Sequence, residues 1–158
     1  MKEIKLTQGL VAKVNDEDFE EMDKHRWYAA KDGNTFYARR RDPLDRAKYI
    51  KMHRAIMQTL DGMETDHKDH DGLNNQKENL RNCTHHQNMM NRRLRCDSTS
   101  KTRGVCWHKT TKKWQTRIGI NGELKHLGLF NRIEDAAKAY NEAAKEYFGD
   151  FALLTTGE

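Results

Sequence analysis

A polar run between positions 64 and 88 constrains the fold more than any other part of this chain. It begins with Glu64-Thr65-Asp66-His67 and ends with Thr84-His85-His86-Gln87-Asn88. Between them, Asp71-Gly72 and Asn74-Asn75 are typical of a loop, and Asn79 to Cys83 is typical of a short extended segment. Thr84 and Gln87 fit a helix-capping box, which predicts a helix from His85 to about Arg95.

The same run carries a distinctive set of polar groups. A carboxylate, Asp66, stands next to an imidazole, His67, and two asparagines follow, Asn79 and Asn88. On a strand, neighbouring residues point to opposite sides, so Asp66 can bind a cation while His67 reaches a water from another direction. A neutral histidine accepts a proton near pH 7, and a carboxylate suits Mg²⁺, which keeps most of its waters. This set is typical of a single-metal phosphodiesterase site.

Charge is distributed unevenly along the chain. Hydrophobic residues make up 35% and the mean hydropathy is −1.07, so we expect small apolar clusters rather than one large core. From Arg81 to Arg117 there are ten Lys or Arg residues and a single acid, Asp97. A basic stretch in an otherwise slightly acidic chain indicates a polyanion partner, and a solvated basic linker is the alternative.

The remaining segments read as short elements. Positions 1 to about 50 are typical of short strands with a helix from Asp16, and Met52 to Leu60 is typical of a helix. Beyond a polar linker at 96–102, residues 103–130 alternate like strands, with a hairpin turn at Asn121-Gly122. Ile133 to Phe148 carries an apolar stripe at helical spacing and ends at Gly149.

The polar run resembles the HNH nuclease family, in its phage and homing-endonuclease branch. The resemblance rests on Glu64-x-Asp66-His67, Glu78-Asn79-Leu80-Arg81 and Thr84-x-x-Gln87-Asn88. It implies a ββα-metal fold in which Asp66 and Asn88 bind one divalent ion and His67 is the general base. Asn79 would tie down the loop and help to orient the histidine. The family often has His where this chain has Asn88, so the pattern here is His-Asn-Asn, with His86 as a reserve ligand.

A second resemblance covers about 103–154. Arg103-Gly104-Val105, Leu127-Gly128-Leu129-Phe130 and Ala136-Ala137-x-Ala139-Tyr140 are similar to the AP2 domain. That domain packs a three-stranded antiparallel sheet on one helix and reads the DNA major groove with Arg and Trp side chains. On the strand of Trp114, alternation points Gln115 and Arg117 away from the helix, toward a ligand.

Two groups of residues are therefore candidate DNA contacts. On the expected helix, Asn88, Arg92 and Arg95 share one face, next to Arg93. Trp107 shares its strand parity with Val105, so it belongs either to the core or to the DNA contacts. The candidates of the C-terminal segment are Arg103, Trp107, Lys109, Lys112, Lys113, Trp114, Gln115, Arg117 and His126.

We therefore expect an α+β chain of two domains. An HNH nuclease domain would span 1–95, with a β-rich segment at 1–50 and a ββα-metal core at about 51–95. An AP2-like DNA-binding domain would span 103–154. The expected function is DNA cleavage at a site chosen by the second domain, with Mg²⁺ as the expected ion and Mn²⁺ or Zn²⁺ as alternatives. The alternatives are a DNA-binding regulator with a decayed nuclease centre and an RNA-binding module.

The sequence also bears on partners and location. Double-stranded DNA is the expected partner, with a monomer as the simplest state and a dimer as the alternative. No run approaches the length of apolar residues that spans a membrane, and the N-terminus lacks the apolar region of a signal peptide. Cys83, Cys96 and Cys106 have no paired spacing, which suits a reducing cytoplasm, here that of the host of a phage or mobile element.

Overall fold

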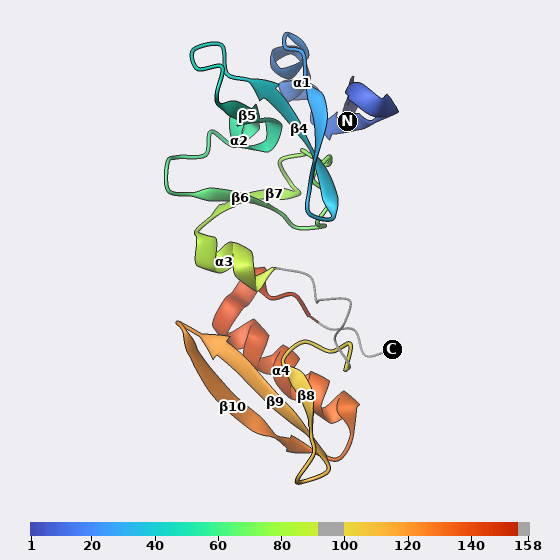
Figure 1. The fold of residues 1–158 in the computed structure, drawn as a ribbon, viewed down its shortest axis with the longest axis vertical. Coiled ribbons are helices and arrows are strands. Elements are labelled where there is room, and N and C mark those ends of the chain that lie inside the picture. The colour runs from blue at the N-terminus through green and yellow to red at the C-terminus, as the bar shows by residue number, and fades with distance from the viewer. Residues whose placement is uncertain (92–99, 155–158) are drawn as a thin grey trace. The chain divides into compact units, whose positions relative to one another are not determined.

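The structure, a computed structural model, describes residues 1–91 and 100–154 (Figure 1). These residues form several small antiparallel sheets and four α-helices, which confirms the α+β prediction. The chain divides into two compact units, Met1–Asn88 and Met89–Glu158. The predicted linker, 96–102, lies largely outside the described residues. In the part of the chain that the structure describes, no helix has the length and apolar character needed to cross a bilayer.

The N-terminal unit begins with a hairpin, a helix and a three-stranded sheet of order β3-β4-β5. The hairpin is confirmed with its register Ile4 opposite Ala12. The short strand β5 was not predicted from the sequence, because three residues are too few to show a periodicity. The elements are β1 (Lys2–Lys5), β2 (Val11–Val14), α1 (Asp16–Asp23), β3 (Tyr28–Asp32), β4 (Thr35–Arg41), β5 (Tyr49–Lys51) and α2 (Met52–Ile56).

One apolar cluster stabilises this unit. The Trp27 indole donates to the Met22 carbonyl at 2.7 Å, which satisfies its buried N–H. Met52 from α2 and Leu80 from the following hairpin are almost fully buried in the same cluster, so the hairpin is packed on the unit's core. The buried members are Ile4, Ala12, Val14, Met22, Trp27, Ala38, Met52, Ile56 and Leu80.

The predicted helix from Met52 to Leu60 is too long. It ends at Ile56, and Gln58 adopts a left-handed backbone with φ of 46°. The Arg54 guanidinium donates to the carbonyl oxygens of Met63 and Thr59, at 2.7 and 3.4 Å. Because this arginine binds carbonyls beyond the helix, the chain turns back where the apolar spacing alone predicts another helical turn.

The polar run forms a hairpin followed by a helix. The strands are β6 (Glu64–His67) and β7 (Leu80–Cys83), and α3 (His85–Met90) follows at once. The capping box is confirmed: the Thr84 N–H donates to Gln87 Oε1 at 2.9 Å, and the Gln87 N–H donates to Thr84 Oγ1 at 3.2 Å. The predicted continuation of the helix to Arg95 falls partly on residues 92–99, outside the described residues.

The C-terminal unit is a three-stranded antiparallel sheet with one helix. Asn121 and Gly122 both have positive φ, 51° and 85°, as a tight hairpin turn requires, and Gly149, with φ of 52°, follows the last helix. Thr116 and Ile118 are buried on the face that packs against α4, where Thr116 Oγ1 donates to the Ala136 carbonyl. The elements are β8 (Val105–His108), β9 (Lys113–Ile120), β10 (Glu123–Phe130) and α4 (Ile133–Phe148).

Candidate functional site

The hairpin β6–β7 carries Asp66 and His67 on opposite faces. Glu64 and Asp66 alternate with Thr65 and His67 along β6. Asp66 lies directly opposite Arg81 on β7. One candidate ligand, Asp66, and the candidate base, His67, are therefore neighbours on β6, with the carboxylates of Glu64 and Asp66 on one face and the imidazole on the other, while the second candidate ligand, Asn88, lies on α3.

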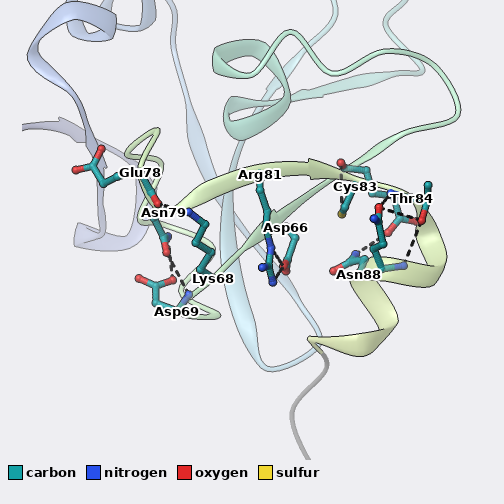
Figure 2. Close-up of polar contacts among 11 residues, drawn as sticks. Asp66, Lys68, Asp69, Glu78, Asn79, Arg81, Cys83, Thr84 and Asn88 are labelled. Carbon is teal, nitrogen blue, oxygen red and sulfur yellow. Dashed lines mark hydrogen bonds and ion pairs between the residues drawn. The ribbon is translucent and has the colours of Figure 1, made fainter. Parts of the chain in front are cut away.

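Arg81 binds the Asp66 carboxylate. Its Nε and Nη2 donate to Asp66 Oδ2 at 2.9 and 2.7 Å, and both side chains are largely buried (Figure 2). Burying a carboxylate is expensive unless a positive group neutralises it, and the guanidinium does so here. A divalent ion bound to Asp66 would either share the carboxylate with Arg81 or displace Arg81 from it. The sequence contains Arg81, but its pairing becomes visible only once the strand register is known.

Asn88 is held by the other carboxylate of β6. Its Nδ2 donates to Glu64 Oε2 at 2.5 Å, and the ring of His85 lies 2.8 Å from Glu64 Oε1. Hydrogen bonds from Asn88 and His85 hold the pKa of Glu64 below its usual range. Because the amide nitrogen is engaged, the amide oxygen is the atom that Asn88 would offer to a cation. Glu64 was not among the predicted site residues.

His67 lies in a buried group of rings on the opposite face. Only 5% of it is exposed, and its ring centroid is 4.8 Å from that of His53 and 5.7 Å from that of Tyr37. Burial lowers the pKa of His67, while a hydrogen bond with Asn75 and nearby carboxylates oppose the shift. His67 is therefore neutral at pH 7 and able to accept a proton. The neighbouring rings fix its orientation.

Asn79 ties together the loop that follows β6. Its Nδ2 donates to Asp69 Oδ1 and to the Asn74 carbonyl, both at 2.9 Å, and its Oδ1 accepts from the Asp69 N–H at 3.1 Å (Figure 2). The loop is also fastened to β4, because the Gly72 N–H donates to Thr35 Oγ1 at 3.1 Å. These bonds give the chain around His67 a fixed path.

The donor set suits a hard cation better than zinc. Asp66 offers a carboxylate and Asn88 an amide oxygen, and Mg²⁺ binds through few protein oxygens while keeping its waters. Structural zinc needs four nitrogen or sulfur ligands. Within residues 1–91 and 100–154, no group of three or more His, Cys, Asp or Glu side chains could hold a metal ion. Asp66 and Asn88 are the oxygen donors that could hold such an ion, and Asp66 is paired with Arg81.

Burial of His53 predicts a loss of stability in acid. Burial, reinforced by the nearby positive groups, lowers the pKa of His53 to about 2. The unfolded chain binds a proton on this ring below about pH 6.5 and the folded chain does not, so stability is complete above that pH and falls below it. Each pH unit below 6.5 should remove about 1.4 kcal/mol from the unfolding free energy for this histidine.

The measurement is urea unfolding at pH 7.5 and 5.5, followed through the NMR signal of the Trp27 indole in the N-terminal unit. His53→Gln should reduce the loss between the two pH values by about 1 kcal/mol. His86→Gln, at an exposed position on α3, is the matched control and should leave the loss unchanged. An equal loss in wild type and His53→Gln would show that His53 does not couple protonation to folding.

In the C-terminal unit, a polar row lies on the sheet face away from α4. Arg117 is exposed and lies opposite His126, and Gln115 Nε2 is 3.5 Å from His126 Nδ1. Arg117 Nη2 donates to the sulfur of Cys106 at 3.5 Å. Three of the predicted DNA contacts, Gln115, Arg117 and His126, are thus brought together across two strands, and Cys106 extends the row to β8.

The two tryptophans lie on the other face. Trp107 and Trp114 are paired across β8 and β9, with ring centroids 5.1 Å apart, and their parity is that of Val105 and Thr116. Trp107 is 47% exposed, so it is neither a full core residue nor a member of the polar row. The structure does not bring the tryptophans together with Arg117.

The remaining predicted contacts are scattered. Arg103 Nη2 donates to the Met89 carbonyl at 3.2 Å, and Lys112 has a left-handed backbone in the turn between β8 and β9. Lys109 is exposed and Lys113 is half-buried near the same turn. Arg92, Arg93 and Arg95 lie outside the described residues.

Comparison with known proteins adds an independent finding. The chain is 30% identical over 153 residues to an uncharacterized HNH endonuclease of Acanthamoeba polyphaga mimivirus, covering 92% of this chain and 74% of that protein. It is also 44% identical over 56 residues to an ethylene-responsive transcription factor of Arabidopsis thaliana, covering 34% of this chain and 13% of that protein. No protein-family model matches the sequence.

Proposed function

The chain belongs to the HNH endonuclease family, and we propose that it is a metal-dependent DNA endonuclease. The observation that carries the proposal is the hairpin β6–β7 with α3. It holds a buried, neutral His67 beside Asp66 and places Asn88, oriented by Glu64, on the adjoining helix. Similarity to a nuclease and to a transcription factor supports DNA as the partner.

Each of these residues would have a separate role in hydrolysis. His67 takes a proton from the attacking water, and Asn79 keeps the surrounding loop in place. Asp66 and Asn88 would hold Mg²⁺, which when bound supplies positive charge to the phosphate and the departing 3′ oxygen. The products would carry 5′-phosphate and 3′-hydroxyl ends.

The C-terminal unit would choose the site of cleavage as an AP2-like DNA-binding domain. Its sheet presents Gln115, Arg117 and His126 on an exposed face, and arginine makes bidentate contacts to guanine in the major groove. The similarity to a plant transcription factor supports this role. Leu124, rather than a polar residue, shares that face, so the preferred bases of plant proteins do not transfer.

One observation favours a second candidate function. The Arg81 guanidinium already neutralises Asp66, as it would in a DNA-binding regulator whose nuclease centre no longer takes a metal. The two candidates differ in one property, which is cutting in the presence of a divalent ion.

A supercoiled plasmid library carrying fragments of the source genome tests the proposal. Wild-type protein with Mg²⁺ should nick or linearise it, and chelator should stop the reaction. Sequencing the new ends would identify the site. Tight DNA binding without cutting in Mg²⁺ or Mn²⁺ would contradict the nuclease and establish the regulator.

A further inference from the structure

The sheet β3-β4-β5 has a second face whose side chains are not needed for the core. Ala38 belongs to the apolar cluster, Ala29 is buried opposite it on β3, and the residues alternating with them point the opposite way. We call the basic and aromatic residues among them the basic–aromatic face. Its members are Tyr28, Tyr37, Arg39, Arg41, Tyr49 and Lys51.

The charged groups of this face lie over its rings. The Arg41 guanidinium is 5.3 Å from the centroid of Tyr49, and the Lys51 ammonium is 5.2 Å from that of Tyr37. Tyr28 stands edge-on to Tyr49 at 6.4 Å. Rings of this kind restrict long basic side chains, so less conformational entropy is lost when they bind a phosphate.

Positive charge prevails on this face. In β3, β4 and β5, all of whose residues are described, the only acid with the same parity is Asp32, which lies 2.5 Å from Arg39 and 3.9 Å from Lys51. It is half-exposed and offsets one of three cations. Burial and the charge of Arg39 lower the pKa of Lys51, as expected where positive groups are crowded. Arg41 is exposed.

The basic–aromatic face contacts His67 through Tyr37. The Tyr37 ring lies under Lys51 and also 5.7 Å from the ring of His67. Gly72, in the loop after β6, approaches so closely that an added Cβ would lie 2.7 Å from the Tyr37 ring. The basic–aromatic face and the His67 side of the hairpin are therefore joined within the N-terminal unit by direct contact.

We propose that the basic–aromatic face binds the sugar–phosphate backbone of duplex DNA beside the phosphate that His67 serves. This inference rests on the proposed function, and it gives residues 28–51 a role apart from base reading by the C-terminal unit. Phosphate contacts of this kind position a duplex and do not depend on its sequence. If this face were only solvated surface, there would be no reason for its cations to lie over tyrosine rings beside His67.

The test compares charge-neutralising variants of the full chain. Arg41→Gln/Lys51→Gln removes two cations from the face, and Lys5→Gln/Lys31→Gln removes two from elsewhere in the same unit. Lys31 is the closer control, since it lies on β3 but points to the opposite side of the sheet. Affinity for a cognate and a random duplex is measured in chelator from 50 to 300 mM salt, and cutting in Mg²⁺ is measured separately.

The Arg41→Gln/Lys51→Gln variant should bind both duplexes about tenfold more weakly at ~0.1 M salt, with a salt slope smaller by about 2. The control variant should match wild type. Equal affinities and equal salt slopes for the three proteins on both duplexes would overturn the proposal. If wild type binds but never cuts, the nuclease assignment fails while this comparison still decides the role of the face.

Discussion

His67→Ala should lower the rate of metal-dependent cutting by at least about 100-fold, the range expected when a general base is removed. His67 is neutral at pH 7 because it is buried, and it is the imidazole beside the candidate metal ligand Asp66. Duplex affinity in chelator should stay within about twofold of wild type, because phosphate contacts rather than this ring carry the binding. Single-turnover cutting and equilibrium binding give the two quantities.

Two further variants make this result interpretable. His67→Asn fills more of the space beside His53 and Tyr37 than alanine does, so a loss of cutting in a stably folded His67→Asn points to chemistry rather than packing. His25→Ala removes a histidine elsewhere in the N-terminal unit and should cut normally. Cutting by His67→Ala at the wild-type rate would reject His67 as the base.

Local sequence signals were sufficient where neighbours in the chain decide the structure. The capping box at Thr84 and Gln87 and the turn at Asn121-Gly122 both involve residues at most three apart, and the structure contains both. α2 ends earlier than its apolar spacing predicts, because Arg54 binds carbonyl oxygens that lie beyond the helix. Propensity alone contains no information about such contacts.

In the candidate site, too, the sequence predicts what neighbouring residues decide but not what distant contacts decide. The sequence marks Asp66, His67 and Asn88 through their order, but their partners depend on register. Arg81 faces Asp66 because of the register in which β6 and β7 pair, and no short turn between these strands reveals that register in the sequence. His53 reaches His67 because Met52, next to it, is buried in the core. Both partners come from tertiary packing.

Gly104→Ala should destabilise the C-terminal unit by more than about 2 kcal/mol, because a left-handed residue and a steric clash act together. Gly104 has φ of 67°, and an added Cβ would lie 2.3 Å from the Tyr140 ring and 2.4 Å from the Arg117 carbonyl oxygen. Neither neighbour can move away easily. Tyr140 is buried in the core of the unit, and Arg117 is in the central strand, where its N–H donates to Gly104.

Gly122→Ala is the matched control, because its φ of 85° is also left-handed but nothing lies within 4 Å of the added Cβ. Gly122→Ala should lower the free energy of unfolding by only about 1 kcal/mol, because only the left-handed backbone conformation opposes the side chain there. Urea unfolding followed by the indole NMR signals of Trp114 and Trp27 reports the two units separately. Gly104→Ala should shift the Trp114 transition and leave that of Trp27 in place. Equal shifts for the two glycine variants would mean that β8 and α4 tolerate a side chain at Gly104.

If Gly104→Ala does destabilise the C-terminal unit more than Gly122→Ala, it should also lose its preference for the cognate duplex. Cutting of random DNA should continue, since His67 and Asp66 belong to the other unit.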